Sequence, residues 1–140
     1  MATRSDLREL YGSTNTAIRR FLNVTENIGT AITYSDSATL GASFTINENG
    51  NYSISYNDQF AVTTAIGLSL NSTQLTTGVL SINVSDKVAI STIGTVNNPY
   101  FVGASLFLRA GDIIRPHIGA ASAAAGSMPS AVQFIIAKVD

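Results

Sequence analysis

Residues 44–60, FTINENGNYSISYNDQF, contain two runs in which apolar or aromatic side chains alternate with small polar ones. The first run ends at Ile46 and the second extends from Tyr52 to Tyr56, with Asn49-Gly50 between them. A period of two is that of a β-strand with one buried face, and an Asn-Gly pair between such runs is a strong hairpin signal. The stretch therefore predicts two antiparallel strands joined by a tight turn.

The same alternation recurs along the rest of the chain, and no helical periodicity interrupts it after residue 30. Segments 92–100 and 118–130 break the pattern and are predicted to be loops, and Ala110-Gly111 is predicted to turn a second hairpin. A series of about eight short strands separated by turn residues predicts an all-β sandwich of the jelly-roll type. The further runs are Ile66, Leu68 and Leu70; Leu80, Ile82 and Val84; Val88 and Ile90; Ala104, Leu106 and Leu108; Ile113 and Ile114; and Val132, Phe134 and Ile136.

Charged residues are concentrated at the N-terminus, where seven of the seventeen fall within the first 26 positions. The shift near Gly29 predicts an N-terminal attachment arm over residues 1–28 and a jelly-roll domain over residues 29–140. Short helices are expected at residues 4–11 and from Ser13 or Thr14 to Leu22, and such helices become ordered only when docked. The residues expected to make the attachment contacts are Arg4, Leu7, Arg8, Leu10, Ile18, Arg19, Arg20, Phe21 and Leu22.

The composition points to a surface that is covered by other protein. Hydrophobic residues make up 45% of the chain and charged residues 12%, about half the share usual in soluble domains. Because large exposed apolar patches mark contacts, copies of the chain or another protein are expected to cover much of it. A net charge of −1 gives no reason to expect nucleic acid as a partner. No apolar run approaches the roughly 20 residues of a membrane span, so no membrane partner is expected.

Few residues have the chemistry of an active site. His117 is the only histidine, it follows Pro116 without a nucleophile motif, and there is no cysteine. The acidic residues are scattered singly over turns, and no glycine pair opens a helix as in a phosphate loop. We therefore expect no enzyme, no cofactor and no metal, although calcium between loops stays open as an alternative.

Several other residues are assigned to contacts between subunits. Arg109 and Arg115 flank the predicted 110–114 hairpin and are either partners in a salt bridge to another subunit or ligand, or solvated strand ends. The tyrosines and phenylalanines in the predicted strands have two possible roles: they offer rings on which sugars stack, or they pack in the core. The predicted trimer-interface residues are Tyr52, Tyr56, Phe107 and His117.

Three stretches, FTINENGNYSISYNDQF, GLSLNSTQL and VGASLFLRAGDIIRPHI, resemble the trimeric jelly rolls of the tumour necrosis factor and complement globular-head superfamily. That family has a Phe-X-hydrophobic strand, a turn with glycine before a tyrosine-containing strand, and a late strand ending in Leu-X-X-Gly-Asp. The corresponding residues are Phe44 to Ile46, Gly50 with Tyr52, and Leu108 to Asp112. The resemblance covers about residues 30–140 and is closest to short versions found in bacteriophage virion proteins.

The resemblance implies a homotrimer in a phage particle. With only about 28 residues before the jelly roll, the chain resembles a capsid decoration (cement) protein whose arm docks on the major capsid protein at the capsid surface. The alternative is the tip domain of a tail fibre, bound to a tail component and recognising a host surface glycan. A sugar- or small-molecule-binding lectin is the third possibility. Secretion signals, collagen-like stalks and disulfides of the eukaryotic relatives are missing from this sequence.

Overall fold

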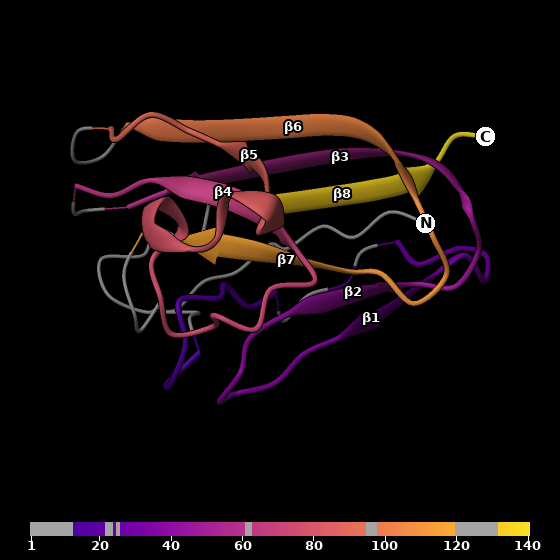
Figure 1. Ribbon diagram of the computed structural model, residues 1–140, viewed down its shortest axis with the longest axis horizontal. Coiled ribbons are helices and arrows are strands. Elements are labelled where there is room, and N and C mark those ends of the chain that lie inside the picture. Colours follow the sequence, from indigo (N-terminus) through magenta and orange to yellow (C-terminus); the bar gives the residue numbers. More distant parts are fainter. Residues whose placement is uncertain (1–12, 22–23, 25, 61–62, 95–97, 120–131) are drawn as a thin grey trace.

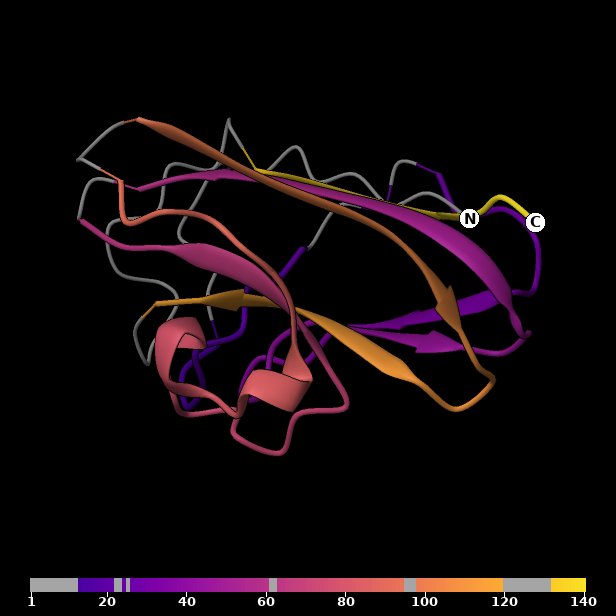
Figure 2. The same cartoon turned by 45° about the horizontal axis from the view of Figure 1, so that its top comes forward.

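The computed structural model describes residues 13–21, 24, 26–60, 63–94, 98–119 and 132–140. Within them, eight strands form two antiparallel sheets, a five-stranded sheet with the order β1-β2-β7-β4-β5 and a three-stranded sheet with the order β6-β3-β8 (Figure 1). Figure 2 shows the sheets as two facing layers, which confirms the predicted all-β jelly-roll sandwich. The strands are β1 (Ile32–Ser35), β2 (Ser43–Ile46), β3 (Gly50–Gln59), β4 (Ile66–Leu70), β5 (Lys87–Ile90), β6 (Pro99–Leu108), β7 (Ile113–Ile118) and β8 (Gln133–Lys138).

The core between the sheets is aromatic. The rings of Phe44 on β2 and Phe134 on β8 stack at 4.3 Å between centroids, and the ring of Phe21 packs edge-on against Tyr56. Tyr52 and Tyr56 are completely buried, because alternate residues of β3 point toward the opposite sheet. This corrects the prediction that these two tyrosines line a trimer interface, and their alternative assignment to the core is the one observed.

The two glycine-containing turns connect the sheets instead of closing hairpins. β2 and β3 on either side of Asn49-Gly50 lie in different sheets, and so do β6 and β7 on either side of Ala110-Gly111. The turns lie together, since the Ala110 N–H donates to Asn49 Oδ1 at 2.8 Å and the Gly111 N–H donates to the Ile46 carbonyl at 2.8 Å. Turn chemistry is local, so it does not reveal whether the next strand pairs with the previous one or crosses to the other layer.

Residues 79–86 form two short 3-10 helices, η1 (Val79–Ser81) and η2 (Val84–Asp86), where a strand was predicted. Val79 and Ile82 point inward and pack with Ala65, whereas Leu80 and Val84 are exposed. Alternating apolar residues were mistaken for a strand because the inward positions here are three residues apart, which fits the 3-10 repeat. Most of the predicted loop at 118–130 lies outside the described residues.

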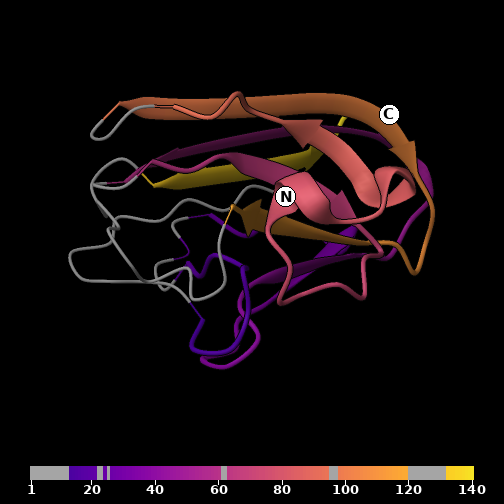
Figure 3. The ribbon, with the colours of Figure 1, turned by 60° about the vertical axis from the view of Figure 1, so that its left-hand side comes forward.

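Residues 13–21, here called the strap, run beside the last half of β7 (Figure 3). Ile18 pairs with His117, the Arg19 N–H donates to the Pro116 carbonyl at 2.9 Å, and the Ala42 N–H donates to the Arg19 carbonyl at 2.9 Å. The strap therefore takes up hydrogen-bonding groups of β7 that β2 does not reach, since the β2–β7 pairing includes only two residues of β2. This corrects the predicted second helix, whereas the helix predicted at 4–11 lies outside the described residues.

Candidate functional site

The outward residues of the three strands of this sheet carry no ionisable side chain, although the Asn51 amide donates to Asp140 Oδ2 at 3.1 Å at one end of the sheet. Its residues follow the strand alternation, so they point away from the core. Ser53 lies opposite Ser105 on one side and Ala137 on the other, and Asn57 lies opposite Phe101 and Gln133. This surface, here called the uncharged face, consists of Asn51, Ser53, Ser55, Asn57, Gln59, Pro99, Phe101, Gly103, Ser105, Phe107, Gln133, Ile135 and Ala137.

Two aromatic rings are the main apolar groups on the uncharged face. Phe101 is 64% exposed and Phe107 is 52% exposed, near opposite ends of β6, and the small residues Gly103 and Ser105 lie between them. The Arg109 guanidinium lies 5.4 Å from the Phe107 ring centroid, at the margin of the face. Exposed aromatic rings on a surface without charge are typical of the centre of a protein–protein contact.

Asn57 adds a polar group that is unsatisfied within the chain. Its side-chain Oδ1 is buried and has no hydrogen-bond partner, although Asn57 belongs to the outward-facing row of β3. An unsatisfied buried carbonyl is unfavourable. Because this oxygen is buried, a second molecule could donate to it only after the Asn57 side chain moved. The exposed contact groups of the uncharged face are therefore the two aromatic rings.

The predicted attachment residues of the strap are held inside the protein. Ile18, Arg19 and Phe21 are each at most 1% exposed, so their side chains are not available to dock on another molecule. This corrects their assignment, and the reason is that their apolar spacing serves the core of the same chain. Phe21 packs against Phe44, Tyr56 and Phe134. Arg4, Leu7, Arg8, Leu10 and Leu22 lie outside the described residues.

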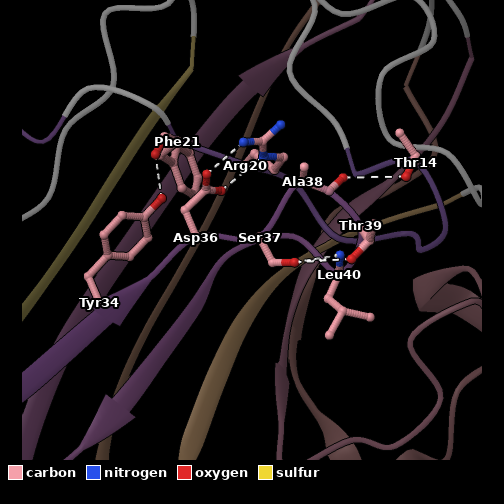
Figure 4. A network of polar contacts seen from close by, with 9 residues as sticks. All are labelled: Thr14, Arg20, Phe21, Tyr34, Asp36, Ser37, Ala38, Thr39 and Leu40. Atoms are coloured by element: carbon pink, nitrogen blue, oxygen red, sulfur yellow. Dashed lines mark hydrogen bonds and ion pairs between the residues drawn. The ribbon is translucent and has the colours of Figure 1, made fainter.

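Arg20 is the one described attachment residue that remains partly exposed, and it pairs within the chain. Its guanidinium donates to both carboxylate oxygens of Asp36, at 3.0 Å and 2.7 Å (Figure 4). Asp36 raises the pKa of Arg20, and the Tyr34 hydroxyl donates to the Phe21 carbonyl beside this pair. Together with the hydrogen bond from the Thr14 N–H to the Ala38 carbonyl, these contacts fix the strap to the connection between β1 and β2.

The other strap arginine forms a buried ion pair. Arg19 Nε lies 2.9 Å from Asp58 Oδ2, with both side chains fully buried, and the guanidinium lies 5.1 Å from the Phe60 ring centroid. The Tyr56 hydroxyl donates to Asp58 at 2.6 Å and the Gln59 N–H donates at 2.8 Å. Burial raises the pKa of Asp58 despite these partners, and burial also raises the pKa of Tyr56. The network joins the strap to β3 across the core.

His117 is buried on the outer side of the five-stranded sheet, under the loop of residues 71–82. Its Nε2 lies 2.7 Å from the Thr77 carbonyl, and burial lowers its pKa. A buried side chain cannot line a subunit contact, which corrects its assignment to the trimer interface. Phe107 alone of the four predicted interface residues is exposed, and its role stays a prediction.

A neutral hollow of about 400 Å³ lies along the free edge of β1. Its polar groups are already ordered, because Asn47 Nδ2 donates to the Thr30 carbonyl at 3.0 Å and to Thr33 Oγ1 at 2.9 Å. None of the described residues that line the hollow is a carboxylate or a cation. Burial raises the pKa of Tyr34, so its hydroxyl stays neutral. The lining residues are Asn27, Gly29, Thr30, Ile32, Thr33, Tyr34 and Asn47.

Sequence reasoning missed the uncharged face as a surface. β6 carries apolar residues on both sides, with Val102 and Leu108 buried and Phe101 and Phe107 exposed. The neighbouring strand β3 is apolar on one side only. The apolar residues on both sides of β6 were therefore a signal that its outer side contacts a second molecule. In the part of the chain that the structure describes, no three His, Asp or Glu side chains group as metal ligands, and no helix is long and apolar enough to cross a membrane.

Comparison with solved structures shows a fold like that of tumour necrosis factor ligands. Murine APRIL at pH 8.5 superposes with a TM-score of 0.67 at 14% identity, over 99% of this chain and 97% of that one. Bushbaby GITRL gives 0.53 at 18% identity over 84% and 82%, and rabbit GITRL gives 0.52 at 12% identity over 76% and 77%. No protein-family model matches the sequence, and no curated protein matches it. The similarity is one of fold.

Proposed function

We propose that the chain is a non-enzymatic structural subunit that assembles as a homotrimer through the uncharged face. The observation that carries the proposal is a sheet surface whose strand residues carry no ionisable group and which exposes Phe101 and Phe107. Identical copies meet on such a surface without like-charge repulsion. A closed ring of copies also shields the edges of the sheet from further pairing. The tumour necrosis factor-like fold and the sequence resemblance favour three copies.

A charge on the uncharged face tests the self-association. Phe101→Asp together with Phe107→Asp places carboxylates where copies would meet, and we expect the mass in solution to fall to that of one chain. Both rings point away from the core, so the folded protomer should remain. The matched control is Thr73→Asp, which adds a charge at an exposed position of the 71–82 loop. If the double variant keeps the mass of the unchanged protein, association does not use this face.

We further propose that the trimer decorates a bacteriophage capsid and contacts the major capsid protein. The sequence resemblance and the low charge content support this location. Because the strap is built into the sandwich, we assign attachment to residues 1–12, which contain Arg4, Leu7, Arg8 and Leu10. Three such segments on one trimer would act together, so that weak single contacts give firm attachment.

Removal of residues 1–12 tests this assignment while leaving the strap in place. The shortened protein should remain a folded trimer but should not bind particles that lack the decoration protein. Copy number in purified particles separates the two virion roles, since hundreds of copies indicate decoration and a few indicate a tail tip. Full occupancy by the shortened trimer would show that attachment lies on the jelly roll.

The second candidate is a tail-fibre tip that recognises a host surface glycan. The hollow beside β1 favours it, because its volume of about 400 Å³ lies in the range of ordinary small-ligand sites and its lining is neutral. Hydroxyl and amide groups at fixed positions match the hydrogen-bonding groups of a neutral sugar. Asn47→Ala removes the side chain that orders Thr30 and Thr33, and under this alternative it should abolish glycan binding without changing assembly.

A further inference from the structure

The hydrogen bond of His117 fixes the tautomer of its ring. The Thr77 carbonyl is an acceptor, so Nε2, at 2.7 Å, must carry the hydrogen. Nδ1 is then a bare acceptor, and it is buried without a hydrogen-bond partner. A second proton would have to enter at Nδ1, which would create a buried charge and a buried N–H without an acceptor. Both consequences are unfavourable in a site from which water is excluded.

Among the described residues, the elements packed around His117 offer no carboxylate to balance such a charge. On β7, the neighbour on the same side is Arg115, whose charge further lowers the pKa of His117. On β4, the facing residues Gly67 and Ser69 do not titrate, and the 71–82 loop contains no ionisable residue. On the strap, Ile18 lies opposite His117, and the next outward residue, Arg20, is itself a cation paired with Asp36.

The strap, the end of β7 and the 71–82 loop are bonded to one another around His117. The Ala17 N–H donates to the Leu75 carbonyl of the loop at 2.7 Å, and the Ile118 N–H donates to the Ala17 carbonyl at 2.8 Å. The His117 ring adds the bond to the Thr77 carbonyl in the same loop. Displacing the ring thus disturbs the loop directly and the strap through the backbone bonds on either side of it.

We propose that His117 is an acid-sensitive latch, and that its protonation releases the strap and the 71–82 loop together from the end of β7. The inference does not depend on the proposed capsid role, although a released strap would free the segment that precedes it. Burial lowers the pKa of His117 in the folded protein, so the opened state binds more protons below about pH 6.5. The latch is therefore closed at neutral pH, and its opening becomes more favourable as the pH falls.

The size of the effect follows from the ordinary pKa of an exposed histidine, about 6.5. If the closed latch stays neutral, the opening equilibrium rises about tenfold from pH 7.5 to 5.5 and about thirtyfold from pH 7.5 to 5.0. Amide hydrogen exchange of the full chain, corrected for the intrinsic effect of pH, should show these increases in residues 13–21 and 71–82. The exchange rates of residues in β3 and β8 should not increase by the same factors over this pH range.

The matched variant is His117→Gln, whose amide can donate to the Thr77 carbonyl but does not titrate in this range. Its exchange should be independent of pH in the strap and the 71–82 loop. Equal acceleration in this variant, no acceleration in the unchanged protein, or equal acceleration in β3 would each overturn the proposal. If the variant does not fold, the latch is tested by following the ring-proton resonance of His117 in the unchanged protein as the pH is lowered. This resonance can be assigned without a variant, since His117 is the only histidine. Titration near pH 6.5 without structural change would refute the latch.

Discussion

The buried pair of Arg19 and Asp58 should behave differently when one partner is removed and when the whole network is replaced. Arg19→Met leaves the Asp58 carboxylate buried beside Tyr56 without a counter-charge, which typically costs about 3–5 kcal/mol. Replacing the network by Arg19→Met, Tyr56→Phe and Asp58→Leu removes the charges and keeps most of the volume. Such replacements are often neutral or stabilising by about 1–4 kcal/mol. We expect the triple variant to be at least as stable as the unchanged protein.

The direction of the Asp58 pKa gives a second test. Because burial raises it above the ordinary value, the folded state holds the proton more firmly than the unfolded state, and the contribution of Asp58 to stability rises as the pH falls toward 4. The cost of Arg19→Met should therefore shrink from pH 7.5 to pH 4.5. Urea unfolding at one fixed protein concentration measures the free energy of unfolding of the unchanged protein, Arg19→Met and the triple variant at both pH values. A cost below about 1 kcal/mol at pH 7.5, or a triple variant as unstable as Arg19→Met, would refute this reasoning.

Three further outcomes are expected. Gly41→Ala should lower the midpoint of thermal unfolding more than Gly29→Ala does. Both glycines have positive φ, but only at Gly41 would a Cβ lie 2.6 Å from Ile18, and equal decreases in the midpoint would contradict this close packing. Phe21→Ala should cost about 3–5 kcal/mol in urea unfolding because its ring is buried among aromatic rings, and a loss under 1 kcal/mol would show that the strap is dispensable. Removing residues 1–28 should lower the midpoint of thermal unfolding measured by circular dichroism, whereas removing residues 1–12 should not, and an unchanged midpoint for the longer deletion would contradict the strap's place in the sheet.

Strands could be predicted from the sequence wherever the burial of one face alone determines the alternation of apolar and polar residues. β3 alternates strictly from Tyr52 to Tyr56, so Tyr52 and Ile54 indicated its buried face directly. Residues 79–86 were misjudged because a short 3-10 turn and a strand both place apolar residues a few positions apart. Pairing was not readable from either glycine turn, since a local turn does not record which sheet the following strand joins.

The strap shows why the candidate site was harder to predict. Ile18, Arg19 and Phe21 stand in a charged segment, and their burial depends on β7, β3 and the 38–42 connection, all distant in sequence. Arg19 in particular becomes a core residue only because Asp58 reaches it across the sandwich. A long-range ion pair of this kind leaves no trace in the local composition. On the uncharged face, Phe107 was assigned to a contact from the sequence but Phe101 was not, although β6 is apolar on both sides.

The mass of the protein in solution tests the proposed assembly most directly. Light scattering coupled to size-exclusion chromatography, at micromolar concentration and neutral pH, should give about 44 kDa, three times the 14.7 kDa of one chain. Phe101→Asp with Phe107→Asp should bring that mass to the value of one chain. A mass of 14.7 kDa for the unchanged protein, with no increase on concentration, would contradict self-association through the uncharged face.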